Sequence, residues 1–219
     1  MSGQDWEEWF RHAWSVREEE VYPKLFGKGT GQIYPLDHDI FSAFSKGDVD
    51  PRWLFQGVLK FPPTDARSSW LFVTSGLSNA WFEDQPNPDG WSGFGCELVL
   101  EADGDFGWAL YLLRRLLAFQ ILLGWGRYEG KALVAIGDRI PLRQPIDSGE
   151  SPLTWCLMAP PLGYTDRFHL PSGNVDFLHV VGITEAEAEF ARSEGSGELL
   201  SRLAVRGYQI TRPARAGVV

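Results

Sequence analysis

The stretch Ser92–Gly104, with the sequence SGFGCELVLEADG, gives the clearest indication of the fold. Side chains of a β-strand point alternately to its two faces. The alternation predicts a strand with two unlike faces: Phe94, Cys96, Leu98 and Leu100 on one, and Gly95, Glu97, Val99 and Glu101 on the other. A dinucleotide-binding loop does not fit, because the third glycine of that fingerprint is missing and no helix begins here. Glu97 is therefore predicted to be a partly buried carboxylate that anchors a loop or a bound peptide, rather than a catalytic group.

Helices are predicted before and after this strand in the sequence, from the spacing of apolar residues and from capping signals. They are Asp5–Tyr22, Trp108–Leu123, residues 184–195 and Gly197–Arg206. The second of these is almost entirely apolar, but Arg114 and Arg115 lie at its centre. It also falls short of about 18 uninterrupted apolar residues, so we predict a buried helix rather than a membrane span.

Further strands are predicted where short apolar runs stand between turn residues. They are residues 53–61, Trp70–Ser75, Ala132–Ile136, residues 154–158 and Val175–Ile183, whereas the Gly- and Pro-containing residues 26–39 are predicted to be loop. Together the elements predict a single α+β domain with a mixed, mostly antiparallel sheet flanked by helices. Residues 1–52 are expected to form an N-terminal helix and loop leader packed on the domain, residues 53–206 the domain itself, and residues 207–219 a tail.

The composition is typical of a well-packed, acidic protein. The chain has 219 residues, of which 44% are hydrophobic, and its formal net charge is −9. A nucleic-acid-binding protein normally carries a basic stripe, and none stands out here, so no nucleic-acid partner is expected. The start, MSGQDWEEWF, has neither the basic nor the apolar region of a signal peptide. We therefore expect a cytoplasmic protein with no membrane partner.

No group of residues indicates catalysis or a bound cofactor. The two cysteines are isolated and the four histidines are dispersed, which argues against a disulfide and against a zinc site. The stretch Gly124–Ala132 resembles a phosphate loop only superficially, because its spacing is wrong and a helix precedes it. We expect no metal, no cofactor and no enzymatic activity. The alternative hypothesis is an uncharacterised enzyme with an acidic pocket around Glu97, Asp138 and His38.

Four stretches follow one another in an order that chance rarely assembles. They are WLFVTSGLSN at Trp70–Asn79, SGFGCELVL at Ser92–Leu100, IGDRIPLRQPID at Ile136–Asp147 and PSGNVDFLHVVGIT at Pro171–Thr184. Together they resemble the suppressor of fused family, specifically its N-terminal domain, and the likeness spans about Trp53–Leu203. The preceding VYPKLFG looks like the leader of bacterial members. In this family the S-G-F-G-x-E-L motif is a core strand signature.

The resemblance implies binding rather than catalysis. Animal members of the family hold transcription factors in the cytoplasm by clamping an extended peptide between this domain and a second, C-terminal domain. Bacterial members often look like single-domain proteins associated with toxin–immunity loci. The resemblance thus implies a protein partner, a toxin or a regulatory protein, and a role as an immunity protein or a regulator that sequesters it.

The resemblance also implies a partner-binding surface. Asp138 matches the aspartate of the family's G-D-H stretch, and Arg139 stands where the family has the histidine. Phe119 stands where a family tyrosine contacts the bound peptide, so the aromatic ring is kept and the hydroxyl donor is lost. Together with Glu97, these three residues form the predicted site. The alternative is that Phe119 belongs to the core and that Asp138 caps a turn.

Overall fold

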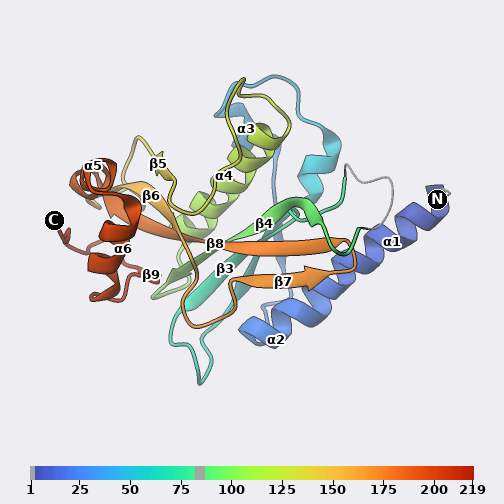
Figure 1. Ribbon diagram of the computed structural model, residues 1–219, viewed down its shortest axis with the longest axis horizontal. Helices are drawn as coiled ribbons and strands as arrows, with labels where there is room; N and C mark the ends of the chain where they lie inside the picture. The colour runs from blue at the N-terminus through green and yellow to red at the C-terminus, as the bar shows by residue number, and fades with distance from the viewer. Residues whose placement is uncertain (1–2, 82–86) are drawn as a thin grey trace.

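The computed structural model of the protein describes residues 3–81 and 87–219. In these residues the strands form one mixed sheet with the order β1-β2-β3-β4-β8-β6-β5, and β7 pairs with β8 and β9 with β4 (Figure 1). Neighbours are antiparallel except where β4 pairs with β8 and with β9. The strands are β1 Ile33–Pro35, β2 Gly57–Phe61, β3 Trp70–Ser75, β4 Trp91–Ala102, β5 Arg139–Pro141, β6 Leu153–Ala159, β7 Arg167–Leu170, β8 Gly173–Thr184 and β9 Ile210–Thr211. The predicted α+β class and the mixed, mostly antiparallel sheet are confirmed.

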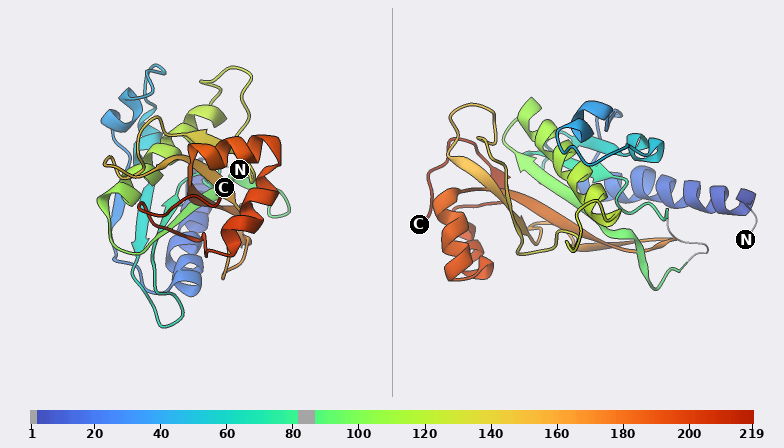
Figure 2. Two further views of the ribbon diagram at one scale, coloured as in Figure 1. Left: turned by 90° about the vertical axis from the view of Figure 1, so that its left-hand side faces the viewer. Right: turned by 90° about the horizontal axis from the view of Figure 1, so that it is seen from above.

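Helices cover both faces of this sheet, and the chain ends lie far apart along the long axis (Figure 2). An α-helix, a π-helical segment and a second α-helix follow one another without a break at the N-terminus. The helices are α1 Gly3–Ser15, the π-helical Val16–Val21, α2 Tyr22–Phe26, α3 His38–Ser42, the 3-10 helix Pro51–Phe55, α4 Gly107–Gly124, α5 Glu185–Ser193 and α6 Ser196–Ala204. The capping signal at the start of the helix predicted for residues 184–195 is a capping box, in which Thr184 and Glu187 each accept the other's backbone N–H.

The central strand β4 is the one predicted from the motif SGFGCELVL. Its pairing with β8 shifts between Trp91 and Cys96, where the strand contains a bulge. Gly93 lies in this bulge with a φ of 57°. A Cβ at this position would lie 2.4 Å from the carbonyl oxygen of Asn79, so the close approach of two backbone segments requires glycine.

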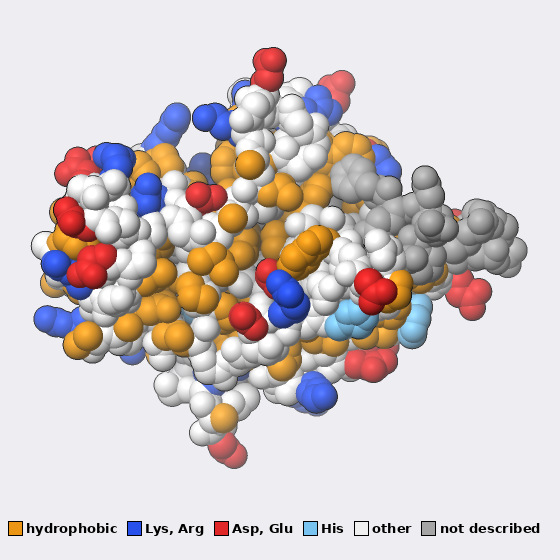
Figure 3. Space-filling view, in the orientation of Figure 1, with side chains coloured by type: hydrophobic (Ala, Val, Ile, Leu, Met, Phe, Trp, Pro, Cys, Tyr) orange, Lys and Arg blue, Asp and Glu red, His pale blue; other side chains and the backbone are white. Residues whose placement is uncertain are grey.

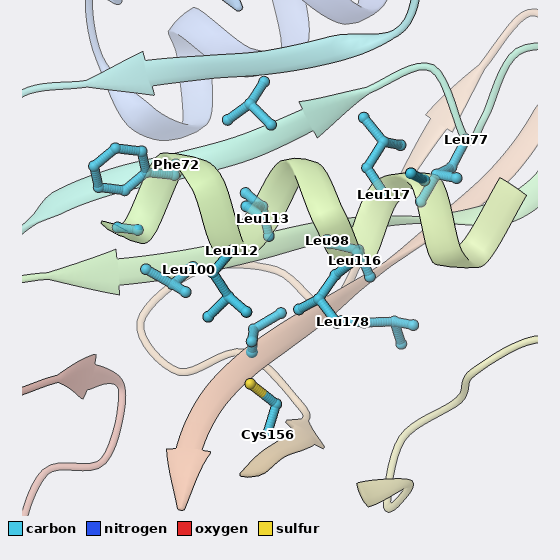
Figure 4. Close-up of a cluster of buried hydrophobic side chains, with 14 of the residues drawn as sticks. Phe72, Leu77, Leu98, Leu100, Leu112, Leu113, Leu116, Leu117, Cys156 and Leu178 are labelled. Carbon is cyan, nitrogen blue, oxygen red and sulfur yellow. The ribbon is translucent and has the colours of Figure 1, made fainter. Parts of the chain in front are cut away.

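Helix α4 packs its apolar side chains against one face of the sheet (Figure 4). Leu113 and Leu117 are fully buried there against Phe72, Leu98 and their neighbours. By length and composition α4 could also cross a membrane, but core helices of globular proteins often have the same length and composition. Its burial against the sheet agrees with the predicted core helix.

The opposite face carries the other set of alternating side chains. Val99 and Phe177 point to this side, where they pack with Tyr22 and Phe26 from the N-terminal helices. Helices α5 and α6 cover the far end of the same face through a separate apolar cluster. The two faces predicted for β4 are therefore the two faces of the observed core.

Three local predictions were wrong. Residues 53–61 are not one strand, because Asp50 caps a 3-10 helix that Pro51 starts and that delays β2 to Gly57. Residues 132–136 are not a strand, because the Gln120 side chain accepts a hydrogen bond from the Val134 N–H and donates one to the Val134 carbonyl oxygen. Both backbone groups are then unavailable for pairing with a strand. Residues 26–39 are not all loop, because they contain β1 and the start of α3, which Asp37 caps.

Segments near both ends of the chain contribute to the core. Tyr22 is fully buried, and its hydroxyl donates to the Thr74 carbonyl oxygen. Near the C-terminus, β9 extends the sheet, and Arg215 forms an ion pair of 2.6 Å with the buried Glu187. Both terminal segments therefore contribute contacts that the central segment lacks by itself.

Candidate functional site

A groove lies between α4 and the chain that follows β5. Its volume is about 290 Å³. The α3 end, α4, β5 and the loop after β5 form its walls, with the lining residues Ala43, Phe44, Tyr111, Leu112, Arg115, Leu116, Phe119, Tyr128 and Ile140–Ile146. A concave, largely apolar site with a few polar groups is typical of ligand-binding surfaces.

Phe119 is part of an aromatic wall in this groove. Its ring stacks on Phe44 at a centroid distance of 6.1 Å and meets Tyr128 edge-on at 5.3 Å. The side chain is half-buried, so it supports the wall and still borders the opening. Phe119 thus lies where it could contact a bound peptide and where it also packs against neighbouring aromatic side chains, as a core residue would.

Two arginines line the same groove. The Arg115 guanidinium lies 5.7 Å from the ring centroid of Tyr111 and 5.9 Å from that of Phe44. Arg143 lies in the loop after β5 with a φ of 63°, an unusual conformation for a residue with a side chain. No aspartate or glutamate is among the lining residues. The polar character of the groove is therefore cationic.

Asp138 and Arg139 stand at the entry to β5 and do not line the groove. The exposed Asp138 accepts a hydrogen bond of 2.9 Å from the Ala135 backbone N–H. The Arg139 guanidinium donates to the Ala191 carbonyl oxygen and to the Ser196 hydroxyl, and so links β5 to α5 and α6. Both residues thus have structural contacts within the chain.

Glu97 is fully buried beneath the loop that follows β3. Its carboxylate accepts hydrogen bonds from the backbone N–H groups of Gly76 and Ser78, each 3.0 Å long, and from the hydroxyls of Ser78 and Thr74. Of the two predicted roles the structure shows the loop anchor. Direct contact of Glu97 with a partner does not fit its burial, because all its acceptor positions face the protein interior.

Arg17 completes this buried cluster, and the sequence interpretation missed it. Its guanidinium donates to Ser75, Ser78 and Asn79 and lies 3.7 Å from the Glu97 carboxylate. The residue is 1% exposed. A signal existed in the sequence, because the helical stripe of Trp6, Trp9, Phe10 and Ala13 continues at Arg17, four residues after Ala13.

The residues of the enzyme alternative are not brought together. Glu97 is enclosed by its loop, Asp138 stands in the turn before β5, and the exposed His38 starts α3. None of the three lines the groove. Within residues 3–81 and 87–219, no group of three or more His, Cys, Asp or Glu residues could hold a metal ion.

His179, the buried one of the four histidines, is a structural residue. His179 is fully buried, with Nε2 2.8 Å from the Gln209 carbonyl oxygen and Nδ1 3.1 Å from the Tyr164 hydroxyl. Because a carbonyl only accepts, Nε2 carries the proton and Nδ1 accepts from Tyr164. Burial lowers the pKa of His179 to about 4, so the ring is neutral near pH 7.

Solved structures share this fold. The chain matches the crystal structure of Drosophila Suppressor of Fused at a TM-score of 0.59 with 20% identity, over 74% of this chain but only 42% of the Drosophila chain. It matches a crystal structure of the Sufu–Fu complex at a TM-score of 0.61 with 19% identity, over 97% of this chain and 91% of the other chain. A protein described as a SUFU homolog from Neisseria gonorrhoeae FA 1090 gives 0.66 with 15% identity, over 97% of this chain and 98% of the other.

The amino-acid sequence itself identifies the family of the chain. No curated protein matches it significantly. The family model for Suppressor of fused protein (SUFU) matches residues 56–216, which is well over half of the chain. The chain belongs to the suppressor of fused family.

Proposed function

We propose that this chain is a non-enzymatic, cytoplasmic protein-binding module that sequesters a protein partner, as an immunity protein or as a regulator. The observation that carries the proposal is the groove between α4 and the chain after β5, where Phe119 forms part of the aromatic wall. Membership of the suppressor of fused family and the existence of a Sufu–Fu complex support it. Residues arranged for catalysis are not among those that line the groove.

The groove suits an apolar side chain of a bound segment. Leu112 and Leu116 contribute its buried floor and Phe119 one side. Burying one Leu- or Phe-sized side chain from water contributes about 1.5–3 kcal/mol. A few such contacts with satisfied polar groups around them are sufficient for a specific complex.

Main-chain pairing along β5 is a weaker mode of binding for this chain. β5 is an edge strand of three residues in the described sheet, and it ends in Pro141. Proline has no N–H to donate to an added strand, and short edge strands with proline resist strand addition. We therefore assign recognition chiefly to side chains in the groove.

Affinity capture from the native host tests the proposal, with a groove-filling variant as the comparison. Ala43 lies exposed at the groove, so Ala43→Trp fills its mouth. Ala204 lies exposed on α6 outside the groove, so Ala204→Trp is the matched control. We expect one protein to be retained by the unmodified chain and by Ala204→Trp and to be lost with Ala43→Trp. Retention by all three chains would remove the groove as the site, and failure to retain any protein would contradict sequestration.

A further inference from the structure

The groove is a cationic site in an acidic protein. The chain has a formal net charge of −9, yet the charged side chains that line the groove are Arg115 and Arg143 alone. The arginines of this chain differ in whether a carboxylate of the same chain lies beside them. Eight arginines of the described chain form ion pairs: Arg11, Arg17, Arg52, Arg114, Arg167, Arg202, Arg212 and Arg215. Arg115 and Arg143 are not among them, and of the arginines without an ion pair they are the two that line the groove.

Arg115 is held in place without using its hydrogen-bond donors. Its contacts are with the faces of Tyr111 and Phe44, and within the described residues its side chain has no hydrogen-bond acceptor. A guanidinium that stacks on aromatic rings keeps its N–H groups available at its edge. Arg115 is thus preorganised to bind an acceptor that the chain does not supply.

Arg143 is held at the opposite wall by the backbone around it. The Leu142 N–H donates to the Thr154 carbonyl oxygen and the Ile146 N–H to that of Leu153, which fixes the loop on both sides. These bonds maintain the left-handed conformation of Arg143, whose φ of 63° is strained for a residue with a side chain. Burial raises the pKa of the Tyr128 hydroxyl and the charge of Arg143 opposes this rise, as expected for a guanidinium near that ring.

We propose that the groove binds an acidic side chain, on an extended protein segment that carries Asp or Glu next to a large apolar residue. The inference rests on the proposed function and specifies its partner. A carboxylate placed between Arg115 and Arg143 would accept charge-assisted hydrogen bonds, which are about twice as strong as neutral ones. The neighbouring apolar side chain would pack on Leu116 and Phe119. A basic segment would meet like charge at both walls and be rejected.

Selection from a display library of random short peptides on the immobilised full-length chain tests this proposal. We expect the selected peptides to be enriched in Asp or Glu beside Leu, Ile, Phe or Trp. For a synthetic peptide of the selected sequence, the double variant Arg115→Gln/Arg143→Gln should weaken binding by at least about tenfold. Replacing the acidic residue of the peptide by its amide should have a similar effect on the unmodified chain.

A matched double variant separates a local effect from a change in net charge. Arg192 lies in α5 and Arg206 follows α6, and both are exposed and outside the groove. Charged side chains of both signs are interspersed over the α5–α6 end of the molecule (Figure 3). Arg192→Gln/Arg206→Gln removes the same charge and should leave peptide affinity within about twofold of the unmodified chain. Thermal unfolding of all variants checks that the fold is retained.

The outcomes distinguish this inference from the proposed function. If selected peptides lack acidic residues, but Ala43→Trp abolishes their binding, the groove binds protein segments and the acidic specificity is wrong. If acidic peptides bind equally to both double variants, the arginines of the groove are not their receptor and the inference is overturned. If the library gives no binder while affinity capture from the host still retains a protein, the inference is overturned and the proposed function stands; if neither gives a binder, both are contradicted.

Discussion

At the scale of single residues, the buried charges explain how the N-terminal helices are fixed to the sheet. The Glu97 carboxylate accepts hydrogen bonds from the backbone N–H groups of the loop after β3. Arg17 reaches the same interior site from the π-helical segment. A buried charge that loses its partner is costly, because the remaining group is neither solvated nor paired. The pair thus couples the position of the leader to the position of the loop.

Arg17→Met is expected to lower the free energy of unfolding by about 3–5 kcal/mol, because it leaves Glu97 buried without its cation. Arg11→Met is the control, since Arg11 is exposed and pairs with Glu7 on the helix surface. Its effect should remain below about 1 kcal/mol. Urea denaturation measures both, and equal effects of the two substitutions would show that the neutral donors around Glu97 are sufficient.

His179 is expected to make the protein less stable in mild acid. Its pKa is about 4 in the folded chain and about 6.5 in the unfolded chain. Between these values the unfolded chain binds a proton that the folded chain does not, so stability falls as the pH falls from about 6.5 to 4, by up to about 3 kcal/mol.

His179→Gln removes this titration and keeps a donor and an acceptor, so its denaturation midpoint should vary less between pH 7 and 4.5 than that of the unmodified chain. Comparing the two chains isolates the histidine from other groups such as Glu101, whose pKa burial raises and whose contribution has the opposite sign. Parallel pH profiles would contradict the assignment.

Gly93→Ala is expected to destabilise the chain more than Gly126→Ala. Both glycines have positive φ, 57° and 68°, so both substitutions carry a similar conformational cost of about 1 kcal/mol. A Cβ at Gly93 also meets the carbonyl oxygens of Asn79 and Leu77 at 2.4 and 2.6 Å, whereas nothing lies within 4 Å of one at Gly126. Thermal unfolding compares them, and equal losses would show that the bulge can widen.

At the scale of elements, the sequence patterns predict those structures whose periodicity spans several residues. The alternation in Gly93–Glu101 and the long apolar run of α4 are unambiguous, and both elements occur as predicted. Predictions failed where one side chain decides the backbone path, as Gln120 does for residues 132–136. Such a contact joins α4 to a residue 14 positions further along the chain, a spacing that no helical or strand pattern contains.

The turn before β5 provides a test of Asp138. Asp138→Ala removes the acceptor of the Ala135 N–H and is expected to lower the free energy of unfolding by about 1 kcal/mol while leaving partner affinity unchanged. The measurement pairs thermal unfolding with binding of the captured protein. A loss of affinity of about 1–3 kcal/mol without a loss of stability would instead make Asp138 a surface anchor.

At the scale of the whole molecule, the groove proposed as the binding site is a product of tertiary packing. Phe119 could be identified through the family resemblance, whereas Arg115 and Arg143 come from segments that meet only when β5 is placed beside α4. Their separation along the chain leaves no motif. The sequence thus indicates the protein family and the aromatic wall of the groove. The positive charge of the groove is seen only in the structure.

The chain that starts at residue 53 is expected not to fold cooperatively. Removal of residues 1–52 takes away Arg17, Tyr22 and Phe26, which fill the face of the sheet opposite α4. Urea denaturation followed by tryptophan fluorescence should show a broad transition or none. The control is the full-length chain cleaved at a protease site inserted at residues 45–48, which keeps both pieces and should unfold sharply. A sharp transition for the truncated chain would contradict the role of the leader.

The parallel pairing of β4 with β8 sets the order in which the protein can assemble during its synthesis. Residues 96–99 leave the ribosome long before residues 176–179, which pair with them. Until β8 emerges, one edge of β4 stays open and the apolar side chains that face Phe177 and Leu178 remain exposed. Contacts between such distant segments slow folding and leave the nascent chain open to aggregation. Chaperone dependence should therefore be highest for chains arrested just before residue 173.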